Sequence, residues 1–111
     1  MPFSSTSDLT KLIQERNTLL CVGLDPDLGQ MPPHLLNEKD PVLTFNKAIA
    51  DATQNLCIAY NLNLAFYETL GKNGWEALEK TVDHIRNLPG GPHLLIADAK
   101  RGDIGNTAEK Y

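Results

Sequence analysis

Short apolar runs alternate along this chain with longer segments of helical spacing. The run "TLLCVGLD" (residues 18–25) is apolar almost until its last residue, which is typical of a parallel strand buried on both faces. The segment "LCIAYNLNLAFYE" (residues 56–68) begins a second run of this kind, and "HLLIADAK" (residues 93–100) forms a third. The pattern therefore predicts three strands.

Helical patterns separate these runs. Asp40 and Pro41 supply an N-cap and a proline at the first position of a helix. We expect its buried stripe to consist of Val42, Phe45, Ile49, Ala52 and Leu56. Gly71 and Gly74 are expected to interrupt the chain before a further helix over residues 75–88, which "PGGP" then ends.

With a helix over residues 7–16 before the first strand, this order implies right-handed βαβ units and a parallel sheet, hence an α/β protein. Polar residues gather where the strands end, the position at which (β/α)8 barrels place their active sites. They are Asp25, Asn61 with Asn63, and Asp98 with Lys100. No GxGxxG follows the first strand to favour a dinucleotide-binding fold. The pattern predicts the first three β/α units of a (β/α)8 TIM barrel.

The chain length bears on how much of a barrel is present. A (β/α)8 barrel takes roughly 250 residues, and this chain has 111. Asn106 and Glu109 have the spacing of a capping box that opens a helix near Thr107, and Tyr111 would end that helix after about one turn. We therefore interpret residues 1–111 as the N-terminal part of a single barrel domain, with no second domain.

Composition narrows the function classes. Ten Lys and Arg against 14 Asp and Glu give a formal charge of −4, which argues against a nucleic-acid partner. No apolar run approaches the roughly 20 residues of a membrane span, and the N-terminus lacks a secretory signal pattern. We expect a cytoplasmic protein with no membrane partner. Cys21 and Cys57, both in apolar runs, are expected in the core, and the scattered histidines predict no metal site.

Four ionisable residues lie within six positions at the end of the third run. Asp98 and Lys100 are two apart and would point to the same side of a strand, with Asp103 three residues further on. An Asp and a Lys in a partly dry site fix each other's ionisation, so that the ammonium can protonate carbon or hold an anionic substrate. The spacing alone equally fits a solvated strand end with weak ion pairs. The apolar run that leads directly into the charges favours a barrel mouth.

These residues resemble a known family. The stretch "DAKRGDIGNT" (residues 98–107) closely resembles the D-x-K-x-x-D-I signature, followed by a Thr, of the orotidine 5′-phosphate decarboxylase family. "CVGLDPD" (residues 21–27) and "AYNLNLAFYETLG" (residues 59–71) resemble that family's first two strands. The resemblance implies a (β/α)8 barrel that forms a homodimer with active sites at the subunit interface. It also implies loss of CO2 from orotidine 5′-phosphate, giving UMP, without a metal or other cofactor.

The resemblance also implies a role for each matching residue. Asp98 would lie against the substrate carboxylate, and Lys100 would protonate the ring carbon as CO2 leaves. Asp103 would reach the partner's site and contact the ribose, with Thr107 supporting it there. Asp25 would bind the ribose from the first strand.

One position departs from the family pattern. Asn61, a substrate-binding position, stands where the family's second strand normally carries a lysine that completes an alternating Lys–Asp–Lys–Asp network. Without that lysine, the formal charges of Asp98, Lys100 and Asp103 sum to −1. We therefore expect impaired substrate binding and chemistry. Phosphate-binding loops after strands seven and eight lie outside the chain, and we expect no activity from it alone.

Two alternatives stay open. One is a metal-dependent phosphosugar decarboxylase or aldolase on the same scaffold; Asn61 and Asn63 in place of an acidic residue argue against it, as does the "DIGNT" continuation. The other is a non-catalytic chain, either a truncated product or a pseudoenzyme that binds nucleotide or a partner barrel.

Overall fold

A computed structural model describes residues 3–100 of the chain. Its elements, in chain order, are α1 (Thr6–Arg16), β1 (Cys21–Gly23), the short 3-10 helices η1 (Leu28–Gln30) and η2 (Pro33–Leu35), α2 (Pro41–Thr53), β2 (Ala59–Asn63), α3 (Leu64–Glu68), α4 (Gly71–Arg86) and β3 (Leu94–Asp98). The three predicted strands are confirmed, although β1 is shorter than the apolar run that predicted it.

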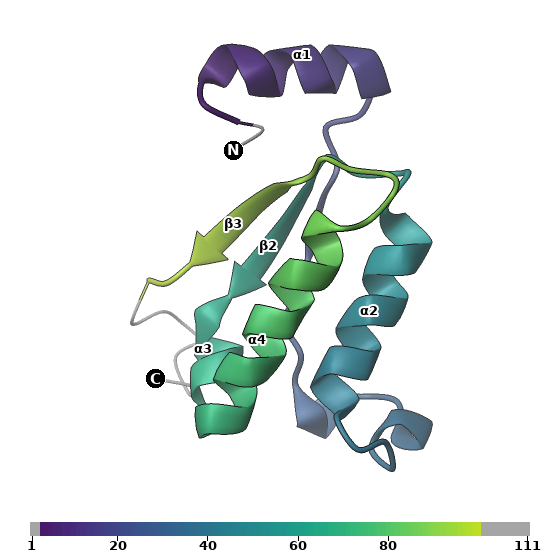
Figure 1. Cartoon of the computed structure of the whole chain (residues 1–111). Coiled ribbons are helices and arrows are strands. Elements are labelled where there is room, and N and C mark those ends of the chain that lie inside the picture. The colour runs from purple at the N-terminus through teal and green to yellow at the C-terminus, as the bar shows by residue number, and fades with distance from the viewer. Residues whose placement is uncertain (1–2, 101–111) are drawn as a thin grey trace.

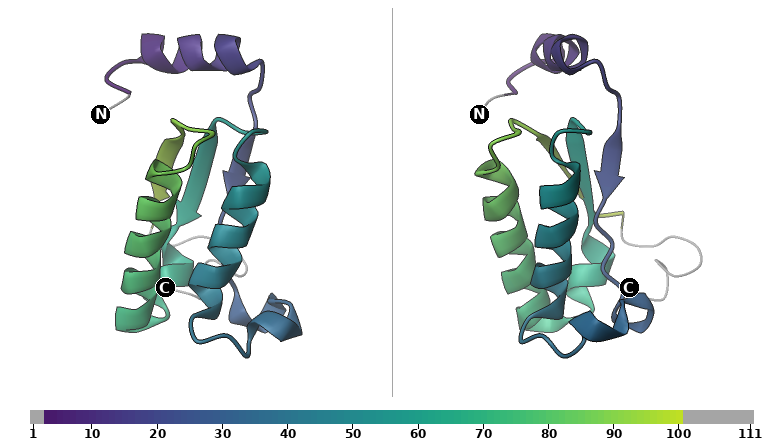
Figure 2. Two further views of the ribbon diagram at one scale, coloured as in Figure 1. Left: turned by 45° about the vertical axis from the view of Figure 1, so that its right-hand side comes forward. Right: turned by 90° about the vertical axis from the view of Figure 1, so that its right-hand side faces the viewer.

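The strands form one parallel sheet in the order β1-β2-β3. Asn61 pairs with Gly23 on one side and with Ile96 on the other, and Asn63 pairs with Asp98. Helices α2 and α4 lie against one face of the sheet, and α1 crosses the end at which the strands begin (Figures 1 and 2). The predicted α/β architecture with parallel strands is therefore confirmed.

The main core fills the space between the sheet and helices α2 and α4. It includes Tyr60 and Leu62, which alternate along β2 with the residues of the opposite face. A smaller cluster of Leu12, Ile58 and Ala59 attaches α1 to the beginning of β2. Helix α1 therefore closes the sheet at the end remote from the predicted site.

Helix α2 begins as predicted, but its buried face differs from the predicted stripe. The Asp40 carboxylate accepts a hydrogen bond from the Leu43 amide at 3.3 Å, so the N-cap is confirmed. The buried residues are Val42, Asn46 and Ala50, whereas Leu56 lies beyond the helix and is 60% exposed. Val42 and Ile49 of the predicted stripe pack in or against the main core, as expected. The prediction was wrong at Leu56, and it missed Asn46 because it counted only apolar side chains.

The predicted interruption at Gly71 and Gly74 was also wrong, because both residues belong to α4. Gly71 has φ 64°, a left-handed conformation that glycine adopts without steric cost. Gly74 lies against the backbone of α3, and a Cβ there would come 1.9 Å from the Tyr67 carbonyl oxygen. These glycines therefore permit a tight junction between α3 and α4.

The second face of the sheet is not covered by the described residues. Cys21 and Gly23 of β1 are exposed, and Ile96 of β3 is 39% exposed. Cys21 was thus wrongly predicted to lie in the core, because it belongs to this open face, whereas Cys57 is buried; both thiols are free. Within residues 3–100, no helix is long and apolar enough to cross a membrane.

Candidate functional site

Five polar residues gather at the carboxyl end of the sheet, and three of them share one face. Residues two apart on a strand point to the same face, and paired residues of neighbouring strands point the same way. Asn61, Asn63 and Asp98 therefore share the face opposite to the one that α2 and α4 cover. Asp25 follows β1 and Lys100 follows β3, both at the carboxyl end of the sheet.

Asp98 and Lys100 form an ion pair at the end of β3. The Lys100 Nζ lies 2.5 Å from the Asp98 Oδ2, and the two side chains are 57% and 19% exposed, respectively. This hydrogen bond is the main reason that the pKa of the Asp98 carboxyl lies below its usual value, and a hydrogen bond from the Asn61 side chain acts in the same direction. The expected proximity of the two residues is confirmed, and Asp98 is held in its ionised form.

The pKa of Asp25 is shifted in the opposite direction to that of Asp98. Partial burial of its carboxyl group raises the pKa, and hydrogen bonds from the backbone and side chain of Asn63 oppose that rise. The negative charge of Asp98 also raises the pKa of Asp25, and the positive charge of Lys100 lowers it. The ends of β1 and β3 therefore contribute to one electrostatic cluster.

Asn63, the last residue of β2, links that strand end to Asp25 after β1, a role that sequence reasoning did not assign to it. Its side chain is buried, its Oδ1 accepts a hydrogen bond from the Ala65 amide at 3.3 Å, and it also contacts Asp25. Because an ionised carboxylate only accepts hydrogen bonds, the side-chain donor to Asp25 is the Asn63 amide nitrogen. The alternation of Asn61 and Asn63 along β2 was the available signal, since it places both on the face of the site.

Asn61 lies two residue pairs deeper in the sheet than Asn63, level with Gly23 and Ile96. Its amide reaches the Asp98 carboxylate and so contributes to the cluster, but it has no charge. The formal charge of the described cluster residues is −1, because two carboxylates, Asp25 and Asp98, accompany one ammonium, Lys100. Asp103 and Thr107, the other predicted site residues, lie outside the described residues.

Two histidines have structural partners away from the site. His84 Nε2 lies 2.7 Å from Asp51 Oδ1 and links α4 to α2, and His93 Nε2 lies 2.8 Å from the Gln54 carbonyl oxygen. Over residues 3–100, no group of three or more His, Cys, Asp and Glu side chains could hold a metal ion.

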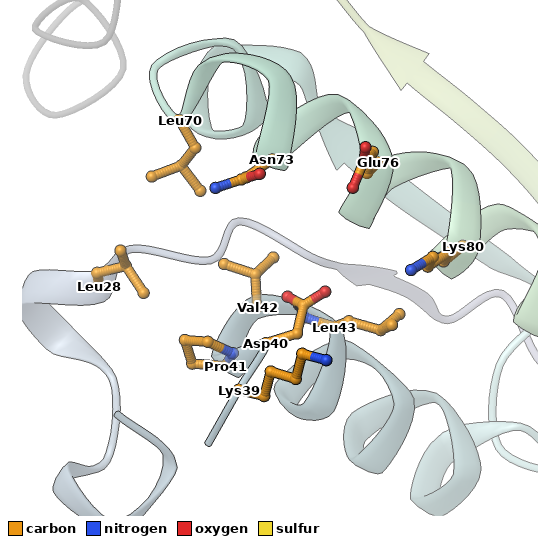
Figure 3. A pocket seen from close by; sticks show the side chains of 10 residues that line it. All are labelled: Leu28, Lys39, Asp40, Pro41, Val42, Leu43, Leu70, Asn73, Glu76 and Lys80. Carbon is orange, nitrogen blue, oxygen red and sulfur yellow. Dashed lines mark hydrogen bonds between the residues drawn. The ribbon is translucent and has the colours of Figure 1, made fainter. Parts of the chain in front are cut away.

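A pocket of about 630 Å³ lies between the first turns of α2 and the α4 helix, outside the polar cluster (Figure 3). Lys39 and Asp40 line it from the start of α2, and Glu76 and Lys80 line it from α4, so its charges are balanced. A smaller pocket of about 170 Å³ includes Asp25 in its wall. Of these two pockets, the smaller one touches the candidate site.

The family assignment rests on a match over most of the chain. Residues 18–111 match the model of the orotidine 5′-phosphate decarboxylase / HUMPS family. The chain belongs to this family. The matched range contains every residue of the cluster, so the polar strand ends belong to an orotidine 5′-phosphate decarboxylase / HUMPS domain.

Relatives within the family agree with this assignment. The chain is 58% identical over 100 residues to an orotidine 5′-phosphate decarboxylase from Phocaeicola vulgatus, covering 89% of this chain and 36% of the relative. It is 53% identical over 108 residues to one from Christiangramia forsetii, covering 96% and 39%. The chain thus spans less than two fifths of the length of these relatives.

Solved structures support the fold. A crystal structure from Toxoplasma gondii, assigned to orotidine-monophosphate decarboxylase, is 34% identical with a TM-score of 0.70, and the match covers 91% of this chain and 32% of that one. The OMP decarboxylase of Leishmania donovani is 35% identical with a TM-score of 0.59, covering 90% and 36%. The parallel sheet and its helices are therefore the first part of a (β/α)8 TIM barrel, as predicted.

Proposed function

We propose that this chain forms the N-terminal part of a barrel that converts orotidine 5′-phosphate to UMP by decarboxylation. The observation that carries the proposal is the Asp98–Lys100 ion pair at the end of β3, in a chain of the orotidine 5′-phosphate decarboxylase / HUMPS family. Relatives that bear the name of this enzyme support the same reaction.

The ion pair has suitable chemistry for the reaction. The ionised Asp98 would lie against the substrate carboxylate and make that ground state unfavourable. As the bond to the carboxyl carbon breaks and CO2 leaves, the electron pair stays on the ring carbon, where the Lys100 ammonium would stabilise it and then donate its proton. The bond that is lost is replaced by a C–H bond, and no oxidant or reductant is required.

Substrate binding would involve Asp25, which follows β1, and a second subunit. Asp25 would bind the ribose, with Asn63 holding its carboxylate. Asp103, supported by Thr107, would contact the ribose in the partner's site, so the active protein would be a homodimer. We propose a cytoplasmic location and a reaction without a cofactor.

The first prediction concerns Asn61. Asn61→Lys in the whole protein should increase the decarboxylation rate by about tenfold or more, because the added ammonium would remove the excess negative charge beside Asp98. A spectrophotometric assay of orotidine 5′-phosphate loss measures the rate. Asn61→Gln is the matched control, since it changes the length of the side chain without adding charge. An equal rate in the lysine and glutamine variants would contradict the charge argument.

The lack of a positive charge at Asn61 also supports a second candidate function, in which the chain binds nucleotide without catalysing a reaction. Two carboxylates and one ammonium among the described cluster residues leave the site negative before an anionic substrate arrives. Calorimetry with UMP, performed beside the decarboxylation assay, separates the two functions. Binding of UMP without turnover, both in the natural chain and in Asn61→Lys, would favour the second candidate.

A further inference from the structure

The residue before Asp25 is held by its backbone from two directions. The Leu24 amide donates to the Asn61 carbonyl oxygen at 2.8 Å, and the Leu24 carbonyl oxygen accepts from the Tyr67 hydroxyl at 2.9 Å. Leu24 and Tyr67 are fully buried, although 43 positions separate them in sequence. The chain therefore enters Asp25 from a residue whose two backbone polar groups both have partners.

Asn46 determines the direction of the Tyr67 hydroxyl. The Asn46 Nδ2 donates to the Tyr67 hydroxyl oxygen at 3.0 Å and to the Thr81 Oγ1, also at 3.0 Å. Because an amide nitrogen carries two protons and the phenol oxygen accepts one of them, the single phenol proton is left to point at the Leu24 carbonyl. Burial raises the pKa of Tyr67, so the hydroxyl stays protonated and remains a donor.

The backbone of Tyr67 is equally constrained. It lies in α3, whose N-cap is Asn63, the residue whose backbone and side chain also hydrogen-bond the Asp25 carboxyl group. On the other side of α3, Gly74 allows α4 to approach the Tyr67 carbonyl. Two groups next to each other are therefore held from α3 and its N-cap: Asn63 hydrogen-bonds the Asp25 carboxyl group, and Tyr67 hydrogen-bonds the carbonyl of the preceding Leu24.

We propose that Tyr67 is a positioning residue for Asp25: its hydroxyl, oriented by Asn46, fixes the Leu24 carbonyl and so places the Asp25 carboxyl group against Asn63. The importance of this placement for ribose binding rests on the proposed function, but the placement itself does not. Tyr67 touches no reacting atom and acts through the backbone of Leu24.

The test follows the Asn63 backbone amide by NMR during a pH titration of the whole protein. Because this amide donates to the Asp25 carboxyl group, its proton shift should follow the ionisation of Asp25, and Asp25→Asn should abolish the response. Tyr67→Phe should remove more than half of the response, since the Leu24 carbonyl loses its donor. Thr81→Val is the matched control: it removes a neighbouring buried hydrogen bond of Asn46 without touching Leu24, and the response should persist.

An unchanged response in Tyr67→Phe would overturn the proposal, and so would an equal loss in both variants, which would indicate general packing. If Tyr67→Phe does not fold, Asn46→Ala replaces it, because this variant keeps the ring and removes the donor that orients the hydroxyl; an unchanged response there would also overturn the proposal.

A kinetic measurement on the whole protein distinguishes this proposal from the proposed function. Tyr67→Phe should raise KM for orotidine 5′-phosphate about tenfold and leave kcat nearly unchanged, the signature of lost ground-state binding. If the amide response is lost in Tyr67→Phe and KM is unchanged, the positioning role stands and the ribose-binding role of Asp25 fails.

Discussion

Two carboxyl groups in the same cluster differ in pKa because their neighbours differ. Asp98 has a hydrogen bond from the Lys100 ammonium, which lowers its pKa, whereas partial burial raises the pKa of Asp25. Charge pairing and desolvation therefore act in opposite directions on the pKa values of two neighbouring carboxyl groups.

This difference can be measured directly. In a ¹³C NMR titration, the Asp98 carboxyl should titrate below the reference value of 3.8 and the Asp25 carboxyl above it. Lys100→Gln should return the pKa of Asp98 toward 3.8 and raise that of Asp25 further, because the positive charge acts on both groups. Lys72→Gln, a change of the same type on α4, should alter neither pKa value. Coincident titration of the two carboxyls in the natural chain would contradict this account.

Among the elements, helices α3 and α4 meet in a tight junction at Gly74 and Tyr67. Gly74 faces the carbonyl of Tyr67, and Tyr67 in turn hydrogen-bonds Leu24 at the end of β1. A helix interior ordinarily disfavours glycine by about 1 kcal/mol relative to alanine. At position 74, however, the close contact with Tyr67 leaves no room for a Cβ atom, so glycine is required.

Gly74→Ala should therefore destabilise the chain, even though alanine is the better helix former. The new Cβ would overlap the Tyr67 carbonyl oxygen, and relief of such overpacking costs about 2 kcal/mol or more. Gly23→Ala is the control, because a Cβ there meets no atom within 4 Å, and its effect should stay within about 0.5 kcal/mol. Urea unfolding followed by circular dichroism measures both. Equal stability of the two variants would show that α4 shifts freely.

The loop before β3 contributes a pH dependence to stability. Burial lowers the pKa of His93, the Gln54 carbonyl opposes this by accepting a hydrogen bond from the imidazole, and the charge of Arg16 adds to the lowering. The folded chain therefore binds fewer protons at this site than the unfolded chain, so stability is complete above about pH 6.5 and decreases as pH falls below it.

Replacement of His93 should weaken this dependence. In urea unfolding between pH 5 and 8, His93→Phe should be less stable overall, because the bond to the Gln54 carbonyl is lost, but its stability should change less with pH. His34→Gln, at an exposed position in η2, should keep the slope of the natural chain. A slope unchanged by His93→Phe would assign the dependence to other groups.

At the scale of the whole molecule, the sheet is covered on one face only by the described residues. Helices α2 and α4 cover one face, and exposed Leu20, Cys21 and Ile96 lie on or before the strands (Figure 2). Within residues 3–100, β3 pairs with β2 alone, so its second edge has free hydrogen-bonding groups. Exposed edges and apolar faces of this kind promote association between chains.

The isolated 111-residue chain should accordingly self-associate as its concentration rises, which sedimentation velocity can measure. Ile96→Lys should reduce association, because it places a charge on the open face beside the free edge. Leu56→Lys makes the same type of change in the turn before β2, at a side chain 60% exposed, and should have little effect. A chain that stays monomeric at all concentrations would contradict the prediction.

Sequence patterns predicted local features well where adjacent residues determine them. The N-cap at Asp40, the order of helices and strands, and the approach of Lys100 to Asp98 depend on neighbours within a few positions. The patterns failed at Asn46 and Gly74, because each is explained by a contact with Tyr67, 21 and seven positions away. Periodicity depends on which side chains are apolar. It cannot show that a buried position needs an asparagine or a glycine because of a contact with a residue elsewhere in the chain.

The sequence by itself determined the α/β order, the family and the approach of Lys100 to Asp98, because strand periodicity and a short motif are local properties of the chain. Only the tertiary structure decided that Asn63 joins the ends of β1 and β2 and that Tyr67 holds the carbonyl before Asp25. Those contacts arise when parallel pairing places distant strand ends side by side, and the pairing register is a property of the folded sheet.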